Sequence, residues 1–166
     1  MIRLCSALLC LLLALPAHAD WQFSTVEGAD GVPLNMVTAG DPAKPAILLI
    51  HGIGQSHYSF VHQLNSELAE DFYLVTFDLR GHGVSGKPWE PEAYSEPEKW
   101  AGDVDAIMTA AGLEQPVVLG WSYGTLVLMD YLRVYGSAKL GAIVLTGALG
   151  GVTPFRMPPA DDPDAM

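Results

Sequence analysis

Residues 116–135 read PVVLGWSYGTLVLMDYLRVY, and they join a short apolar strand to an apolar helix through the G-x-S-x-G pattern Gly120-Trp121-Ser122-Tyr123-Gly124. Such a tight strand-to-helix turn exposes the serine hydroxyl above the sheet, at the positive end of the helix dipole. Side chains two positions from the serine would collide, so Gly120 and Gly124 have to be small. We therefore expect Ser122 to be a catalytic nucleophile. The alternative is an ordinary glycine turn in which Ser122 caps the helix.

A second segment that indicates catalysis is His51-Gly52-Ile53-Gly54, which directly follows the apolar run Ala46–Ile50. A continuous apolar run is typical of a strand that is covered on both faces. A backbone N–H in the turn after such a strand can aim at a substrate oxygen, and Ile53 is the expected donor. Together with the N–H of Tyr123 it would form an oxyanion hole. The side chain of His51 is expected to brace the loop by hydrogen bonding and not to act as a base.

The third segment is Asp78-Leu79-Arg80-Gly81-His82-Gly83-Val84-Ser85. Residues 81–86 also match the G-x-G-x-x-G fingerprint of dinucleotide-binding proteins, which has to open a helix. Here Pro88 and Pro91 follow the motif and argue against a helix, so nucleotide binding is not expected. The histidines of the chain also lack the spacing of metal ligands on one helix. The sequence therefore predicts neither a cofactor nor a metal site.

Taken in order, the segments HGIG, DLRGHGVS and GWSYG resemble the motifs of the α/β-hydrolase fold family, over about residues 21–150. The resemblance implies a mostly parallel sheet with helices on both faces, and an acyl hydrolase such as an esterase, lipase or peptidase. It also implies that the loop with Arg80 and His82 is mainly structural. Related dehalogenases and epoxide hydrolases carry aspartate at the elbow, so Ser122 favours carboxylic esters or similar acyl compounds as substrates.

The rest of the chain alternates strands and helices, as an α/β fold requires. Strands are expected at residues 21–27, 32–38, 46–50, 73–77, 117–119 and 142–146. Helices are expected at 59–70, 97–111 and 123–135, and residues 78–95 are expected to form a loop.

Composition narrows the class of partner. The 166 residues suit a single domain. The chain has 8 Lys and Arg against 19 Asp and Glu, a net charge of −11, and offers no basic surface to a nucleic acid. Because 50% of the residues are hydrophobic, the acidic balance does not indicate a disordered tail. A small-molecule acyl substrate is therefore the expected partner.

The first 19 residues have the pattern of a secretory signal peptide. Arg3 precedes an apolar run over residues 4–15, and Ala17-His18-Ala19 provides a cleavage pattern before Asp20. The alternative is a membrane anchor, but the run is shorter than the roughly 20 residues that span a bilayer. We therefore expect export to the periplasm or the medium, with no stable membrane anchor after cleavage.

What the sequence lacks is a base for the serine, because a hydroxyl is a weak nucleophile until a base takes its proton. The histidines after the leader (His51, His57, His62 and His82) all precede Ser122. The resemblance implies an acid and then a histidine after the serine. Of the later acids, Asp130 lies two turns down the helix, and Asp161, Asp162 and Asp164 stand in a Pro- and Asp-rich tail.

These observations predict the N-terminal part of a hydrolase domain over residues 20–150, with residues 151–166 as an irregular start of a cap region. Truncation after about the sixth strand would leave Ala142–Thr146 as an exposed apolar edge, so self-association is expected. Two alternatives to an exported serine hydrolase remain. One is a non-catalytic protein of the same fold that only binds. The other is a catalyst in which His57 or His82 reaches Ser122 from an earlier loop.

Overall fold

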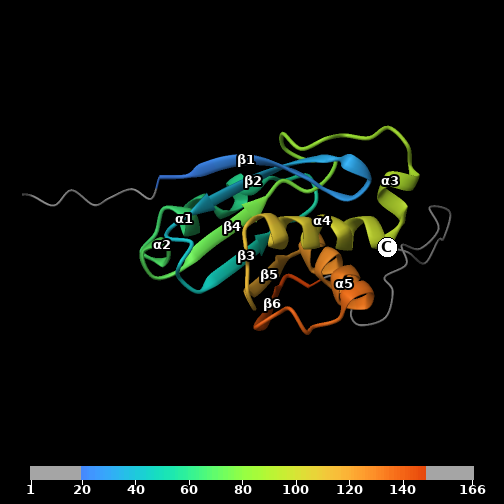
Figure 1. Cartoon of the computed structure of the whole chain (residues 1–166). Helices are drawn as coiled ribbons and strands as arrows, with labels where there is room; N and C mark the ends of the chain where they lie inside the picture. The colour runs from blue at the N-terminus through green and yellow to red at the C-terminus, as the bar shows by residue number, and fades with distance from the viewer. Residues whose placement is uncertain (1–19, 149–166) are drawn as a thin grey trace, which may run out of the picture.

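The computed structural model describes residues 20–148, which form a six-stranded sheet with helices on both faces (Figure 1). The strands are β1 Gln22–Glu27, β2 Pro33–Ala39, β3 Ala46–Ile50, β4 Tyr73–Phe77, β5 Val117–Trp121 and β6 Ala142–Thr146. Their order across the sheet is β1-β2-β4-β3-β5-β6. The strands β4, β3, β5 and β6 are parallel, whereas β1 and β2 pair in antiparallel fashion. This architecture confirms the predicted α/β fold class. The predictions for residues 1–19 and 151–166 concern parts of the chain outside the described residues.

Two long helices cover one face, α4 Pro97–Ala110 and α5 Tyr123–Tyr135, and both agree with the sequence prediction. Successive side chains along β4 point to opposite faces of the sheet. Val75 belongs to the same buried cluster as Val104 of α4 and Leu128 of α5. Its neighbour Leu74 packs instead with Ala69, beneath the short helices of the opposite face. Within the described residues, no helix is long and apolar enough to cross a membrane.

The single helix predicted over residues 59–70 is wrong. The structure divides the segment into a 3-10 turn at His57–Phe60 and two short helices, α1 Val61–Leu64 and α2 Leu68–Asp71. The amide of Asn65 donates to Val61 O at 2.8 Å, and the hydroxyl of Ser66 donates to Gln63 O at 2.8 Å. Side chains that bond local backbone in this way compete with helical hydrogen bonds. The predicted helix is therefore interrupted at Asn65 and Ser66, between α1 and α2.

The predicted loop over residues 78–95 is correct except at its end, where Glu92–Ser95 forms the short helix α3. Pro91 directly precedes α3 with φ −56° and ψ −30°, which is already helical geometry. A proline has no N–H to donate, so a helix start is a place where it is tolerated.

The loop after β4 is tied to the helices by a buried ion pair. The guanidinium of Arg80 holds both carboxylate oxygens of Asp103 on α4 at 2.7 Å, and neither side chain is exposed to solvent. Further guanidinium donors bond the carbonyls of Ala93, Ala29 and Lys99 at 2.9–3.2 Å. Asp103 also accepts the N–H of Ala29 at 2.9 Å. Arg80 therefore joins the loop after β4 to α4, to the segment around Ala93 and to the turn at Ala29.

We expect Asp103→Ala to destabilise the fold strongly, because it leaves the Arg80 charge buried without a counter-charge. Removal of one partner from such a pair costs about 3–5 kcal/mol of unfolding free energy. Urea denaturation measures the loss. Lys139→Ala removes an exposed pair with Asp105 and serves as the control, for which no measurable change is expected. Equal effects of the two variants would contradict this assignment.

The strand β6 pairs only with β5 within the described residues, and all five of its residues are exposed. The side chains of Ile143, Val144 and Leu145 are 37%, 42% and 47% exposed. Unpaired N–H and C=O groups beside apolar side chains form a template for pairing with another chain. Self-association through this edge stays a prediction, and β6 is the place where it can be tested.

We expect Val144→Lys to reduce self-association, because an edge lysine blocks strand pairing. Light scattering with increasing protein concentration measures the effect. Val134→Lys introduces the same charge at a 39% exposed valine of α5 and controls for charge alone. A wild-type chain that remains monomeric and melts cooperatively would overturn the prediction.

Candidate active site

The turn between β5 and α5 holds Ser122 in a strained backbone conformation, with φ 53° and ψ −119°. Positive φ is unfavourable for a residue other than glycine and persists only where the surroundings impose it. Here the N–H of Ser122 donates to Thr146 O at 2.9 Å, which ties the turn to the end of β6. Its carbonyl accepts the N–H of Thr125 at 2.9 Å and the hydroxyl of Thr125 at 2.6 Å. The serine is therefore fixed from both sides.

Close backbone contacts explain the two glycines of the motif. A methyl group on Gly120 would lie 2.8 Å from the carbonyl oxygen of Gly124. A methyl group on Gly124 would collide with the carbonyl oxygen of Ile50 and lie 2.8 Å from that of His51. Because the obstructing atoms are backbone, no side-chain movement can relieve these contacts. The elbow requires glycine at both positions.

The structure brings the turn after β3 against the serine. A carbon placed on Gly52 would lie 3.2 Å from Ser122 Cβ and 3.5 Å from Ser122 Oγ. Within residues 20–148 the N–H of Ile53 has no hydrogen-bond acceptor, and the Ile53 side chain is 60% exposed. Tyr123 is the first residue of α5, so its N–H has no acceptor within the helix. The two amides expected to form an oxyanion hole thus belong to the segments on either side of Ser122.

His51 is buried and braces the loops. Its Nδ1 lies 2.8 Å from Gly52 O, and its Nε2 accepts the N–H of Leu79 at 3.0 Å. These partners require a neutral ring that is protonated at Nδ1. Burial, and to a smaller extent the nearby His82, lower the pKa of His51 to about 4, although the bond to Gly52 opposes the shift. His51 therefore joins the loops after β3 and β4.

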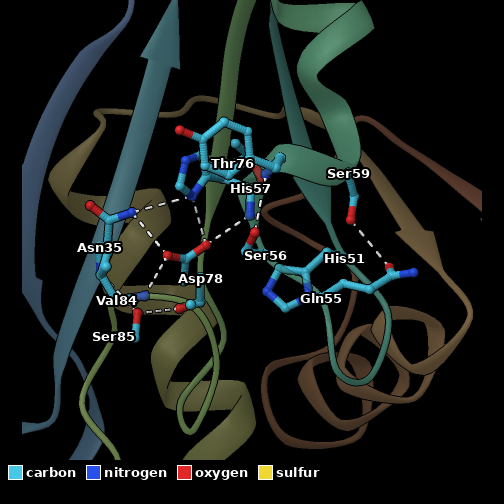
Figure 2. A network of polar contacts seen from close by, with 12 residues as sticks. Asn35, His51, Gln55, Ser56, His57, Ser59, Thr76, Asp78, Val84 and Ser85 are labelled. Atoms are coloured by element: carbon cyan, nitrogen blue, oxygen red, sulfur yellow. Dashed lines mark hydrogen bonds and ion pairs between the residues drawn. The ribbon is translucent and has the colours of Figure 1, made fainter.

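Asp78 is the centre of a buried polar network at the end of β4 (Figure 2). Its carboxylate accepts hydrogen bonds from the backbone N–H of His57 at 2.7 Å and from the ring Nδ1–H of His57 at 2.8 Å. It also accepts the N–H of Val84 at 2.9 Å and the amide of Asn35 at 3.1 Å. Burial opposes ionisation, but the donors from Val84 and His57 outweigh it and hold the pKa of Asp78 below its usual value. The network joins β2, β4 and the turn before α1.

Among residues 20–148, no histidine is hydrogen-bonded to Ser122. The ring of His57 bonds Asp78 and packs against Trp21 and Phe23, with centroids 6.3 and 5.9 Å away, near the β1 edge of the sheet. Its Nε2 is buried and has no partner. Nδ1 of His82 lies 2.9 Å from Arg80 O. In residues 20–148, no hydrogen bond joins either ring to Ser122.

Asp130 lies on α5, eight residues after Ser122. It forms an ion pair with Arg133 and lines a cavity of about 200 Å³ together with Trp100 and Tyr123. Burial raises the pKa of Asp130, and it also raises that of Tyr123. The other candidate acids, Asp161, Asp162 and Asp164, lie outside the described residues.

Several backbone amides of the loop after β4 are already hydrogen-bonded to other groups of the protein. Gly81 N donates to Gly86 O at 2.9 Å, Gly86 N donates to Pro33 O at 2.7 Å, and Val84 N donates to Asp78. The next helix begins only at Glu92. A phosphate would need free amides at a helix start, so the loop geometry argues against the dinucleotide interpretation. Among the described residues, no group of three His, Cys, Asp or Glu could hold a metal ion.

Sequence reasoning missed three parts of the site: Gln55, whose amide bonds the Gly52 turn; the carbonyl of Thr146; and the network around Asp78. The first two are contacts between segments that no local motif predicts. The third carried a signal, since His57 and Asp78 both stand next to predicted strand or helix ends. Their pairing, however, depends on the packing of β3 beside β4.

The arrangement described above is that of an α/β-hydrolase. The family model for the alpha/beta hydrolase fold matches residues 45–166, and the chain belongs to this family.

Relatives with named activities also match this chain. Epoxide hydrolase A of Mycobacterium tuberculosis is 31% identical over 101 residues, which are 61% of this chain and 31% of that protein. Mouse epoxide hydrolase 4 is 33% identical over 115 residues, 69% of this chain and 32% of that protein. The solved structure of esterase RhEst1 from Rhodococcus sp. ECU1013 superposes with a TM-score of 0.71 and 36% identity. It covers 77% of this chain and 47% of RhEst1, so the chain spans less than half the length of each relative.

The buried neutral His51 makes stability depend on pH. Its pKa is about 4 in the folded chain and 6.5 when exposed, so the unfolded state binds more protons between these values. Stability from His51 is complete above pH 6.5 and falls as the pH is lowered towards 4, by about 3 kcal/mol. Urea denaturation of wild type and His51→Gln across this range measures it. The stability difference between the two should shrink as the pH falls, and a constant difference would refute the assignment.

Proposed function

We propose that this protein is an exported serine hydrolase of carboxylic esters or similar acyl compounds, with Ser122 as its nucleophile. The observation that carries the proposal is the strained Ser122 turn packed against Gly52. In this proposal the hydroxyl of Ser122 would act beside two backbone amides, those of Ile53 and Tyr123. Preorganised amides of this kind stabilise the charge that develops in acyl transfer.

The chemistry follows from these positions. Ser122 Oγ would attack the acyl carbon while a base takes its proton, and the carbonyl oxygen would become an oxyanion held by the N–H groups of Ile53 and Tyr123. Collapse of the intermediate breaks the bond to the alcohol, which leaves with the proton from the base. Water then attacks the acyl-serine by the same route. No histidine of residues 20–148 bonds Ser122, so we assign the base to none of these residues.

The residue at the elbow distinguishes between the activities named among the relatives. Hydrolases of esters and of epoxides differ in their nucleophilic residue. Related epoxide hydrolases carry aspartate at the position where this chain has Ser122. RhEst1, named as an esterase, is 36% identical to the chain. These two facts favour an acyl ester over an epoxide. The leader-like residues 1–19 support a periplasmic or secreted location.

A second candidate function is binding without catalysis by a protein of the same fold. It is favoured by one observation, which is that no histidine of residues 20–148 bonds Ser122. In that case the elbow would persist as a structural turn.

Labelling with a fluorophosphonate separates the two candidates, because the probe reacts only with an activated serine. We expect the probe on Ser122, located by mass spectrometry, and complete loss of label in Ser122→Ala. Ser137→Ala changes an exposed serine after α5 and should label like the wild type. A folded, cooperatively melting chain that takes up no label would favour the binding protein.

A further inference from the structure

Gln55 links the turn after β3 to the helix region that follows it. Its Oε1 accepts the N–H of Gly52 at 3.2 Å and the hydroxyl of Ser59 at 3.2 Å. Figure 2 shows the Gln55 side chain reaching from this turn toward Ser59, on the side of the site away from Asn35. The side chain is half-buried.

The position of this amide relative to the nucleophile is defined by Gly52. A carbon placed on Gly52 would lie 3.1 Å from Gln55 Oε1 and 3.5 Å from Ser122 Oγ. Both oxygens therefore lie within 3.5 Å of one point. Gly52 itself is buried, so its N–H would have no acceptor without Gln55.

The bond also decides which amide of the turn is available to a substrate. Gly52 N–H is occupied by Gln55, whereas Ile53 N–H has no acceptor in residues 20–148. Gly54, at φ 69°, lets the chain fold back so that the side chain of Gln55 returns to Gly52. The Gln55 side chain thus spans the turn and bonds back to Gly52.

We propose that Gln55 is a positioning residue, which holds the Gly52 turn so that Ile53 N–H faces the acyl oxygen, and that Ser59 holds Gln55 in place. This inference rests on the proposed function of Ser122 and adds to it a residue that acts through Gly52. Gln55 does not touch the reacting atoms in this role. Its effect is on the orientation of the donor, to which acyl transfer is sensitive at the scale of about 1 Å.

The variants follow from the chemistry of the amide. Gln55→Met keeps the length of the side chain and removes the acceptor. Gln55→Glu keeps an acceptor for Gly52 but brings a negative charge close to the developing oxyanion. Ser59→Ala removes only the second bond to Gln55. Gln63→Met makes the same change at an exposed glutamine of α1 and is the matched control.

Fluorophosphonate labelling of the full chain, resolved into probe affinity and the maximal rate of labelling, gives the first readout. We expect Gln55→Met to lower the maximal rate about ten-fold with little change in affinity, since a misplaced donor acts on the transition state. Ser59→Ala should lower it less, and Gln63→Met should not lower it. Gln55→Glu should also be slow. A maximal rate for Gln55→Met within two-fold of wild type, at equal Tm, would overturn the proposal.

Amide hydrogen exchange, followed by NMR, gives a readout that does not depend on catalysis. Gly52 N–H should exchange at least ten-fold faster in Gln55→Met than in wild type, and should stay protected in Gln55→Glu. A general loss of structure would raise exchange throughout β3 instead. Where the wild type takes up no label, the proposed function fails, and the exchange of Gly52 alone then decides whether Gln55 positions the turn. Unchanged exchange in Gln55→Met would refute it.

Discussion

The backbone of α5 approaches the end of β3 so closely that only a hydrogen atom fits between them at Gly124. This approach determines where the helix begins, and hence where Ser122 stands above the sheet. The second glycine, Gly120, allows β5 to pass under the first turn of the same helix. Since β3 also leads into the turn with Ile53, the contact between α5 and β3 fixes Ser122 relative to the proposed oxyanion donors. A substituent at either glycine would separate them.

Buried polar groups extend this frame to the loop after β4. His51 bonds Leu79, Asp78 bonds His57 and Val84, and Arg80 bonds Asp103 on α4. Each of these side chains crosses from one chain segment to another, and each is buried. A buried polar group without its partner is unfavourable, so each bond restricts the loops to one arrangement. These bonds make the loops more rigid than their glycine content alone would allow.

The sequence predicted the regular elements well because their signals are local. The continuous apolar run at residues 46–50 and the helix at 123–135 were located correctly, and so was the serine elbow between strand and helix. The helix expected at 59–70 failed because apolar spacing does not register the side-chain bonds of Asn65 and Ser66. Contacts such as Asp78 with His57 join residues 21 positions apart and depend on the strand order. No spacing rule predicts them.

Acyl transfer requires oxyanion stabilisation and proton transfer, and the two call for different kinds of group. Oxyanion stabilisation uses backbone N–H groups, which are fixed wherever strands and a helix pack as β3, β5 and α5 do. Proton transfer needs an imidazole at hydrogen-bond distance from Ser122, and this depends on one side chain from another segment. Two of the histidines before Ser122 brace loops instead, His51 by its bond to Gly52 and His57 by its bond to Asp78. Use of either ring as a base would break bonds that hold the loops around Ser122, so in residues 20–148 the structure favours a structural role for both.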